Sequence, residues 1–200
     1  MFGLIFFICI TVFLLIRLNN ILGMHIGFKA DVKNDIFGSE NTVEEVSSAV
    51  KMQEKIQTVS EIFPTFNAED FLDKAKKAFE IIFAAYAEED KITLNDLLCQ
   101  RMYSAFSMAI DDRKNKREKL EGVLVRFISA EIIDVAVKSN DVFLDVKFVT
   151  EQSNVLKNHL GEVIEGSSDY VETRTDIWTF SRKKISGNPK WLLYEIKNQE

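Results

Sequence analysis

The chain has 200 residues, of which 46% are hydrophobic and 28% charged, with a formal net charge of −6. This length accommodates one domain with short appendages, not two full domains. The negative balance disfavours a nucleic-acid-binding domain, which normally shows a basic patch, and it also disfavours a general attraction to anionic lipid.

Of the two cysteines, Cys9 lies in the apolar N-terminal segment and Cys99 in a predicted helix. We therefore expect no disulfide framework, which fits a reducing compartment.

The first segment is an apolar run without a charged residue from Phe2 to Ile16. Continued to Leu22 as a helix it spans about 30 Å, the thickness of a bilayer core, provided that Arg17 extends toward the headgroups. The run predicts a membrane anchor over residues 1–22. Its principal apolar side chains are Phe2, Leu4, Phe6, Phe7, Phe13, Leu14 and Ile16.

A cleaved secretory signal peptide is the alternative interpretation of this run. No Lys or Arg precedes it and no small-residue cleavage site follows it, so an uncleaved anchor is favoured. Arg17, Lys29 and Lys33 all follow the run, and the positive-inside rule then places the rest of the chain in the cytoplasm. The expected location is the inner membrane, crossed once.

Residues 23–63 form a connecting arm. Thr42 and Glu45 have the spacing of a capping box, and apolar residues at helical spacing predict a helix over 43–61. A helix lying on the membrane surface usually carries a basic face, whereas this one is of mixed charge. The pattern favours a docking or half-disordered arm over a membrane-surface helix.

The soluble domain, residues 64–200, opens with a strong helix signal after Pro64. Asn67 is a suitable N-cap, and Phe66 and Phe71 stand at the two positions of a hydrophobic staple. The expected buried stripe is Phe71, Ala75, Ala78, Phe79, Ile82 and Tyr86.

A turn at 88–91 separates this helix from a second one, which we expect to begin at Thr93 with Asp96 at N3 and an Ile92–Leu97 staple. This helix ends in the charged run 111–121, which is typical of a solvated helix end. A basic patch over Arg113–Lys119 would instead favour contact with a ribosome or an anionic lipid.

From Gly122 onward the period of the apolar residues changes from 3.6 to 2, which indicates strands. A loop is expected over 151–168 and a turn over 187–189. Short connections between successive strands imply an antiparallel meander, so the expected fold is α+β, with helices packed on a curved antiparallel sheet. The expected strands are 123–127, 132–137, 142–149, 170–182 and 191–196.

No metal or nucleotide site can be recognised in the sequence. His25 and His159 lack partners at metal-ligand spacing, and no Walker-type, Rossmann or nucleophile-elbow motif occurs. Cys99 has no evident base, so a structural helix cysteine is the better interpretation than a nucleophile. No cofactor is expected.

An enzyme remains an alternative, because helices on a curved sheet can enclose a cavity in which a carboxylate and a tyrosine act as acid and base. The candidates are Asp145, Asp176, Tyr103 and Tyr170. They form no diagnostic pair, so we expect a protein without enzymatic activity.

Two segments carry a family resemblance: residues 176–182 have the pattern D-x-W-T-F-x-R, and residues 189–193 have P-x-W-x-L. They resemble the C-terminal domain of the 44-kilodalton subunit of the mitochondrial inner-membrane import translocase and its bacterial homologues. Helical patterns from Phe71 and from Leu94, and the loop G-x-V-x-x-G at 161–166, are similar to that family as well. The resemblance covers about residues 66–197.

The resemblance implies membrane association, an apolar pocket able to take lipid or an acyl chain, and contact with a protein-translocation machine. The long N-terminal region that recruits the import motor's chaperone has no counterpart here, so that role is not carried over. A mitochondrial ribosome receptor and a large-subunit ribosomal protein are similar to the domain, which makes ribosome contact an alternative.

The candidate pocket residues are aromatic, and filling of an ordinary core is the competing interpretation. They are Phe79, Phe83, Phe106, Phe148, Trp178 and Phe180. Trp178 and Phe180 share one strand face, and Ile177 and Thr179 the other. We expect Arg182 to pair with Asp176 or with a helix carboxylate.

The sequence thus predicts a membrane-anchored binding or tethering module for lipid or protein clients, without direct nucleic-acid contact. The expected partners are membrane lipid and a translocon, nascent chain or ribosome. The alternatives are an isomerase- or dehydratase-like enzyme and a ribosome-docking factor.

Overall fold

The computed structural model describes residues 40–167, 170–185 and 190–198. The sheet, the three helices that follow Pro64 and the last turns of α2 belong to one compact unit, residues 49–200. The helices are α2 (Glu40–Ile62), α3 (Ala68–Ala87), α4 (Lys91–Leu97) and α5 (Gln100–Lys116). The strands are β1 (Lys119–Lys138), β2 (Asp141–Lys157), β3 (Val163–Gly166), β4 (Glu172–Lys183) and β5 (Leu192–Asn198).

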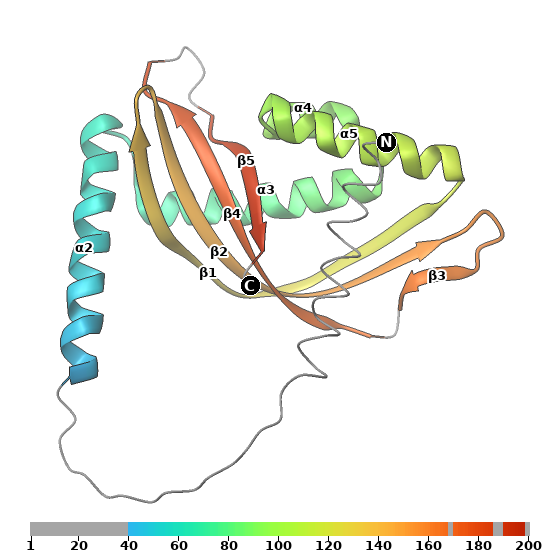
Figure 1. The fold of residues 1–200 in the computed structure, drawn as a ribbon, viewed down its shortest axis with the longest axis horizontal. Coiled ribbons are helices and arrows are strands. Elements are labelled where there is room, and N and C mark those ends of the chain that lie inside the picture. The colour runs from blue at the N-terminus through green and yellow to red at the C-terminus, as the bar shows by residue number, and fades with distance from the viewer. Residues whose placement is uncertain (1–39, 168–169, 186–189, 199–200) are drawn as a thin grey trace, which may run out of the picture. The chain divides into compact units, whose positions relative to one another are not determined.

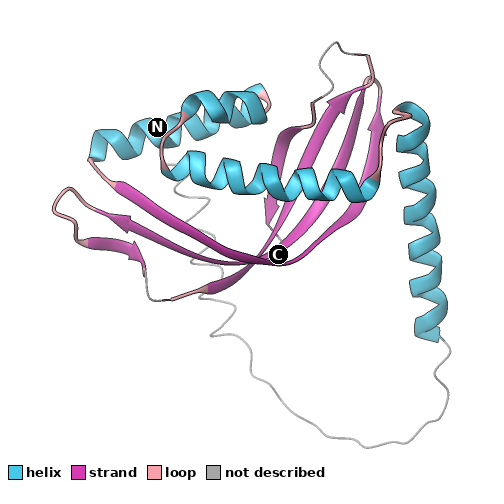
Figure 2. Ribbon diagram, turned by 180° about the vertical axis from the view of Figure 1, so that it is seen from behind, coloured by secondary structure: helices cyan, strands magenta, loops and turns pink. Residues whose placement is uncertain are grey.

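The strands form one antiparallel sheet in the order β1-β2-β4-β5, with β3 paired to the far end of β2. The sheet does not close on itself, and it is strongly bent, with α3 crossing its concave side (Figures 1 and 2). Helices that precede a meander of strands confirm the α+β class expected from the sequence. We call the face toward α3 the inner face and the opposite one the outer face.

The first strand differs from the expected pair 123–127 and 132–137, because β1 runs unbroken over Lys119–Lys138. Its register with β2 shifts at Val125, Ile128 and Ile133, each of which has no partner on β2. Each such bulge reverses the alternation of side chains along the strand. Val123 is consequently 60% exposed, whereas Phe127 packs against the core.

The loop expected over 151–168 is a hairpin. β2 continues to Lys157, and β3 returns alongside it, with Val155 opposite Gly166. Gly166 has a φ of +80°, and a Cβ there would lie 1.9 Å from the backbone oxygen of Asn154, so only glycine fits. The short strand escaped the sequence analysis because four residues show too little alternation.

The N-terminus of α3 is capped as predicted. The Asn67 side chain accepts a hydrogen bond from the Asp70 backbone N–H, and the rings of Phe66 and Phe71 lie 5.7 Å apart. The helix expected over 43–61 is present as α2. It begins at Glu40, so Thr42 lies inside the helix and does not cap it.

The single helix expected from Thr93 is two helices. Asp90, not a later residue, caps α4, because its Oδ1 accepts from the backbone N–H groups of Ile92 and Thr93. Ile92 is 82% exposed and forms no staple. At Leu98 the chain becomes extended and pairs with Leu193 of β5, which interrupts the helix before α5.

None of the helices that the structure describes is long and apolar enough to cross a membrane. The anchor expected over residues 1–22, together with Cys9 and His25, lies outside the described residues, as does the turn expected over 187–189.

Candidate functional site

An aromatic cluster fills the space between α3 and the inner face of the sheet. The ring of Phe79 lies 4.4 Å from Trp178, 5.1 Å from Phe148 and 5.4 Å from Phe127, measured between centroids. Phe79 also stacks on Phe83 at 6.3 Å. Phe79 and Phe148 are fully buried, whereas Phe83 and Phe127 are half-buried and form the rim of the cluster.

Two periodicities bring these rings together. On α3, the spacing of three to four residues puts Phe79 and Phe83 on the face turned to the sheet. On the strands, alternation directs Phe148 and Trp178 to the same inner face. Gly122 lets α3 approach, because a Cβ there would lie 3.0 Å from the ring of Phe83.

The structure joins five of the six predicted pocket residues. The ring of Trp178 lies 5.9 Å from that of Phe148 and 6.3 Å from that of Phe180. Trp178 also contacts Phe79, and Phe79 in turn contacts Phe83. Phe106 is buried too, but its ring packs on Tyr86 of α3, 5.1 Å away. Trp178 with Phe180, and Ile177 with Thr179, lie on opposite faces as predicted.

A second aromatic group lies at the end of the sheet where β5 begins. Trp191 packs on Phe71 at 5.2 Å and on Phe63 at 5.8 Å. Among the described side chains, Arg182 pairs neither with Asp176 nor with a helix carboxylate. Its guanidinium lies over the ring of Phe63, 4.1 Å from the centroid. The sequence analysis missed this group because Phe63 belongs to a segment predicted to be an arm.

The inner face becomes polar beyond the aromatic cluster. Asp176 lies opposite Phe148, and Thr150 and Arg174 lie opposite each other one alternation further along. Burial raises the pKa of the Asp176 carboxyl, and the nearby Arg174 offsets this only in part. Thr150 is fully buried, and its Oγ1 has no hydrogen-bond partner in the described part of the chain.

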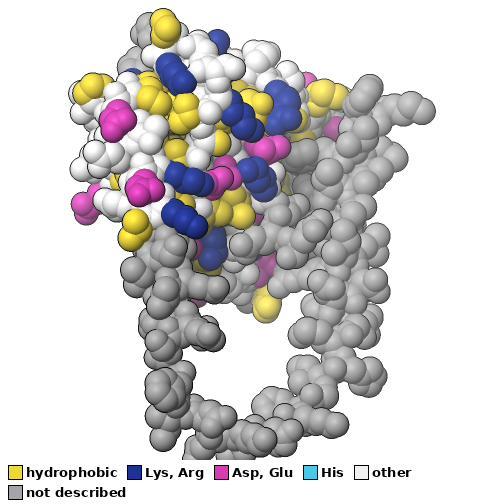
Figure 3. Space-filling model, turned by 60° about the vertical axis from the view of Figure 1, so that its left-hand side comes forward, with side chains coloured by type: hydrophobic (Ala, Val, Ile, Leu, Met, Phe, Trp, Pro, Cys, Tyr) yellow, Lys and Arg dark blue, Asp and Glu magenta, His cyan; other side chains and the backbone are white. Residues whose placement is uncertain are grey.

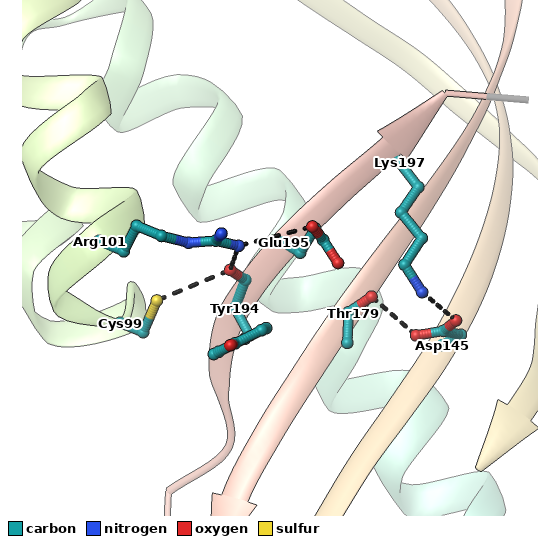
Figure 4. Close-up of polar contacts among 7 residues, drawn as sticks. All are labelled: Cys99, Arg101, Asp145, Thr179, Tyr194, Glu195 and Lys197. Atoms are coloured by element: carbon teal, nitrogen blue, oxygen red, sulfur yellow. Dashed lines mark hydrogen bonds and ion pairs between the residues drawn. The ribbon is translucent and has the colours of Figure 1, made fainter. Parts of the chain in front are cut away.

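The other carboxylate considered for catalysis, Asp145, lies on the outer face (Figure 4). It accepts a hydrogen bond of 2.7 Å from the Thr179 hydroxyl and one of 2.6 Å from Lys197. Within the described residues no hydrogen bond joins Asp145 or Asp176 to Tyr103 or Tyr170. The four acid–base candidates are therefore not brought together.

Cys99 was predicted to lie within a helix. It occupies the N-cap position of α5, where its side chain makes no capping hydrogen bond. Its backbone N–H donates to the Leu193 carbonyl at 2.9 Å, and its Sγ lies 3.7 Å from the Tyr194 carbonyl oxygen (Figure 4). His159 is exposed in the β2–β3 turn. Among the described residues, no cluster of His, Cys, Asp and Glu is arranged to hold a metal.

The cations of the run Arg113–Lys119 largely face carboxylates. Arg113 is buried, donates to the Tyr86 carbonyl at 2.7 Å and lies 3.7 Å from Glu89. Lys114 pairs with the same glutamate at 3.2 Å. Lys116 pairs with Asp112, and Lys119 with Glu121. The run is thus not simply a solvated helix end, and its charge is largely balanced.

Comparison with known proteins adds three findings. Residues 52–198 match the sequence profile of the Tim44-like domain family. The solved intermembrane-space region of the chloroplast protein ARC6 is similar in structure, with a TM-score of 0.48 and 14% sequence identity over 67% of this chain and 97% of that chain. No curated protein sequence matches the chain.

Proposed function

The chain belongs to the Tim44-like domain family, and from that membership we propose that it is a membrane-associated, non-enzymatic module that binds apolar parts of lipid or protein clients beside a protein-translocation or membrane-protein-assembly machine. In this proposal the segment over residues 1–22 anchors the chain in the inner membrane and the domain faces the cytoplasm.

One observation carries the proposal: in the described part of the chain, α3 covers the inner face through apolar contacts. Ring contacts join it to β1, β2 and β4 through Phe79. No hydrogen bond or ion pair joins α3 to the strands within the described residues. Apolar contacts have no fixed direction, so a helix held by them can shift and admit an apolar chain without breaking a polar network.

The half-buried rings of Phe83 and Phe127 mark where such a client would enter. They lie at the edge of the cluster, and both contact the fully buried Phe79. A site lined by aromatic side chains with few polar groups suits an acyl chain or an apolar polypeptide segment.

Photo-crosslinking of the full chain in its membranes tests this proposal. Probes replace Phe83 and Trp178, and a third replaces the exposed Lys116 as a control outside the cluster. We expect adducts to phospholipid or to translocon, ribosomal or nascent polypeptides at Phe83 and Trp178, and fewer at Lys116. Adducts confined to a metabolite-sized soluble species, or equal labelling at all three positions, would overturn the proposal.

A small-ligand enzyme is the second candidate, and Asp176 is the observation in its favour. Its carboxyl lies beside the aromatic cluster and has a raised pKa. One alternation further along the same face, the Thr150 hydroxyl has no hydrogen-bond partner among the described residues. A metabolite-sized adduct at Trp178 that disappears in Asp176→Asn would favour this candidate.

A further inference from the structure

The first half of β1 leaves one edge of the sheet open. In the described part of the chain β1 pairs with β2 alone, and its register from Lys119 to Leu124 runs without a shift. Among the described residues, none of the backbone hydrogen bonds outside helices and strands involves residues 119–124. The N–H and C=O groups of every second residue here therefore point away from the sheet. We call Lys119–Leu124 the open edge.

The rest of β1 is protected in ways that are common for edge strands. The bulges at Val125 and Ile128 follow the open edge directly, and bulges interrupt regular pairing with a further strand. Beyond them, Lys55 of α2 pairs with Asp134 of β1 at 2.6 Å. The open edge is thus one short, regular stretch with room for a single added strand.

The open edge adjoins the rim of the aromatic cluster. On its outer face Val123 is 60% exposed. On its inner face Leu124 packs against the core, and a Cβ at Gly122 would lie 3.0 Å from the ring of Phe83. Side chains opposite each other on neighbouring strands lie about 5 Å apart. The inward side chains of an added strand would therefore lie beside Leu124 and Phe83, where we place the entry of the client.

The charges around the open edge are paired with one another. Glu121 lies 3.2 Å from Lys119 and 2.5 Å from Lys157, and Arg126 lies 2.7 Å from Glu151. On the face of the molecule drawn in Figure 3, basic and acidic side chains likewise lie close together, with hydrophobic ones between them. The open edge consequently suits an uncharged partner better than a charged headgroup or a strongly charged peptide.

We propose that the open edge binds an extended apolar polypeptide segment as an additional strand of the sheet. This inference rests on the proposed function and narrows it, since it names a polypeptide as the client and its backbone as the part recognised. An acyl chain has no donors or acceptors for the edge. A helix has already used most of its own backbone groups. An extended polypeptide supplies both N–H and C=O groups at strand spacing.

Peptide binding to the full chain in phosphatidylcholine nanodiscs tests this proposal. The probe is a fluorescein-labelled peptide of alternating valine and threonine, methylated at every second backbone nitrogen so that it cannot form sheets with itself. Its other edge keeps the N–H donors. The control peptide has the same side chains and is methylated at every backbone nitrogen. We expect the control to bind at least about tenfold more weakly in fluorescence anisotropy, because several backbone hydrogen bonds are lost. Equal affinities would overturn the proposal.

Amide hydrogen exchange locates the bound probe on the unsubstituted chain. We expect slower exchange in residues 119–124 and no change in the exposed turn at Leu160. Protection that spares residues 119–124 would contradict strand addition. This measurement needs no substitution, so it decides the matter even where a variant fails to fold.

A charge placed on the open edge provides the second arm. Val123→Lys should weaken binding of the probe at least about tenfold, because lysine on an edge strand opposes the addition of an uncharged strand. Val50→Lys makes the same change at a valine of similar exposure on α2, and it should leave the affinity unchanged. Equal affinities of the two variants would count against the open edge as the binding site.

Two other outcomes have distinct signatures. If the chain without peptide sediments as a dimer in which residues 119–124 are already protected, a second copy occupies the edge and the proposal is wrong. If strand addition is wrong but the proposed function is right, native crosslinks from Phe83 persist while the probe leaves exchange at 119–124 unchanged. If the proposed function is wrong, the probe still protects 119–124 while Phe83 yields no apolar client.

Discussion

The two faces of the sheet are built from alternate residues of the same strands, yet they are held by different forces. On the inner face of β4, Trp178 joins a continuous set of aromatic rings beneath α3. On the outer face, Thr179 and Ile177 lie among hydrogen-bonded ion pairs such as Asp145–Lys197. The comparison teaches that one strand can present an apolar face held by non-directional ring contacts and a polar face held by directional hydrogen bonds and ion pairs.

The outer face also illustrates how charge is distributed across strands. Asp134 of β1 lies opposite Asp145 of β2, and each of these like charges has its own cation. Lys55 of α2 pairs with Asp134, and Lys197 of β5 pairs with Asp145. The hydrogen bond from Lys55 lowers the pKa of the Asp134 carboxyl. Such pairs favour one register while contributing little to the free energy of folding.

The largest expected effect comes from removing the central ring of the inner face. Trp178→Ala should lower the free energy of unfolding by about 3–5 kcal/mol, because it leaves a cavity beside Phe79 and Phe148. Urea unfolding followed by far-ultraviolet circular dichroism measures this. Ile177→Ala, on the outer face of the same strand, is the control and should cost clearly less. Equal losses would show that the two faces do not differ as described.

A smaller effect is expected at the polar edge of the inner face, where burial raises the pKa of Asp176. The unfolded chain then ionises this carboxyl at lower pH than the folded chain does, so its contribution to stability is fully present below its ordinary pKa and is lost as pH rises through the raised value. Asp176→Asn removes that loss.

The free energy of unfolding of Asp176→Asn, relative to that of the unsubstituted chain, should therefore increase from acid to neutral pH. Urea unfolding at a series of pH values measures this difference. Asp141→Asn, at a group on the same sheet outside the aromatic region, serves as the control. An advantage that is constant with pH would contradict a raised pKa at Asp176.

On the outer face, Thr179→Val should cost about 1 kcal/mol, because the buried hydroxyl donates to Asp145 and valine cannot replace that bond. Thr173→Val, at an exposed position of the same strand, should be nearly neutral. Calorimetric melting temperatures of the two variants provide the measurement. A neutral Thr179→Val would mean that Lys197 alone satisfies the carboxylate.

The smallest effect is expected for an exposed ion pair of the outer face. Lys147 lies 3.0 Å from Glu131, and both side chains are partly in water. A double-mutant cycle with Lys147→Ala and Glu131→Ala should give a coupling energy of at most about 0.5 kcal/mol, reduced further by salt. A coupling above that of Thr179 with Asp145 would reverse the ranking of contacts on this face.

Local patterns in the sequence were sufficient to predict much of the secondary structure of this protein and the directions of several side chains. The Asn67 cap and the Phe66–Phe71 staple of α3, the alternation of β2 over 142–149 and the opposite directions of Trp178 and Thr179 were all predicted correctly. Each depends on residues close in sequence, where helix and strand periods dictate which side chains share a face. The motif at 176–182 likewise pointed to the family that matches residues 52–198.

Contacts between distant segments decided what these patterns could not. Leu98 pairs with Leu193, almost a hundred residues later, and thereby splits the predicted second helix into α4 and α5. The bulges at Val125, Ile128 and Ile133 exist only relative to β2, so no window of the β1 sequence contains them. Arg182 found an aromatic ring, Phe63, where a carboxylate was expected.

The sequence by itself therefore determined the α+β class, the main helix and strand periods and the family, because these arise from local periodicity and short motifs. Only the tertiary structure decided which aromatic residues form one cluster, where Asp145 and Asp176 lie and which ring the Arg182 guanidinium contacts. The physical reason is that burial and charge pairing depend on neighbours that the chain brings together only when the sheet has formed.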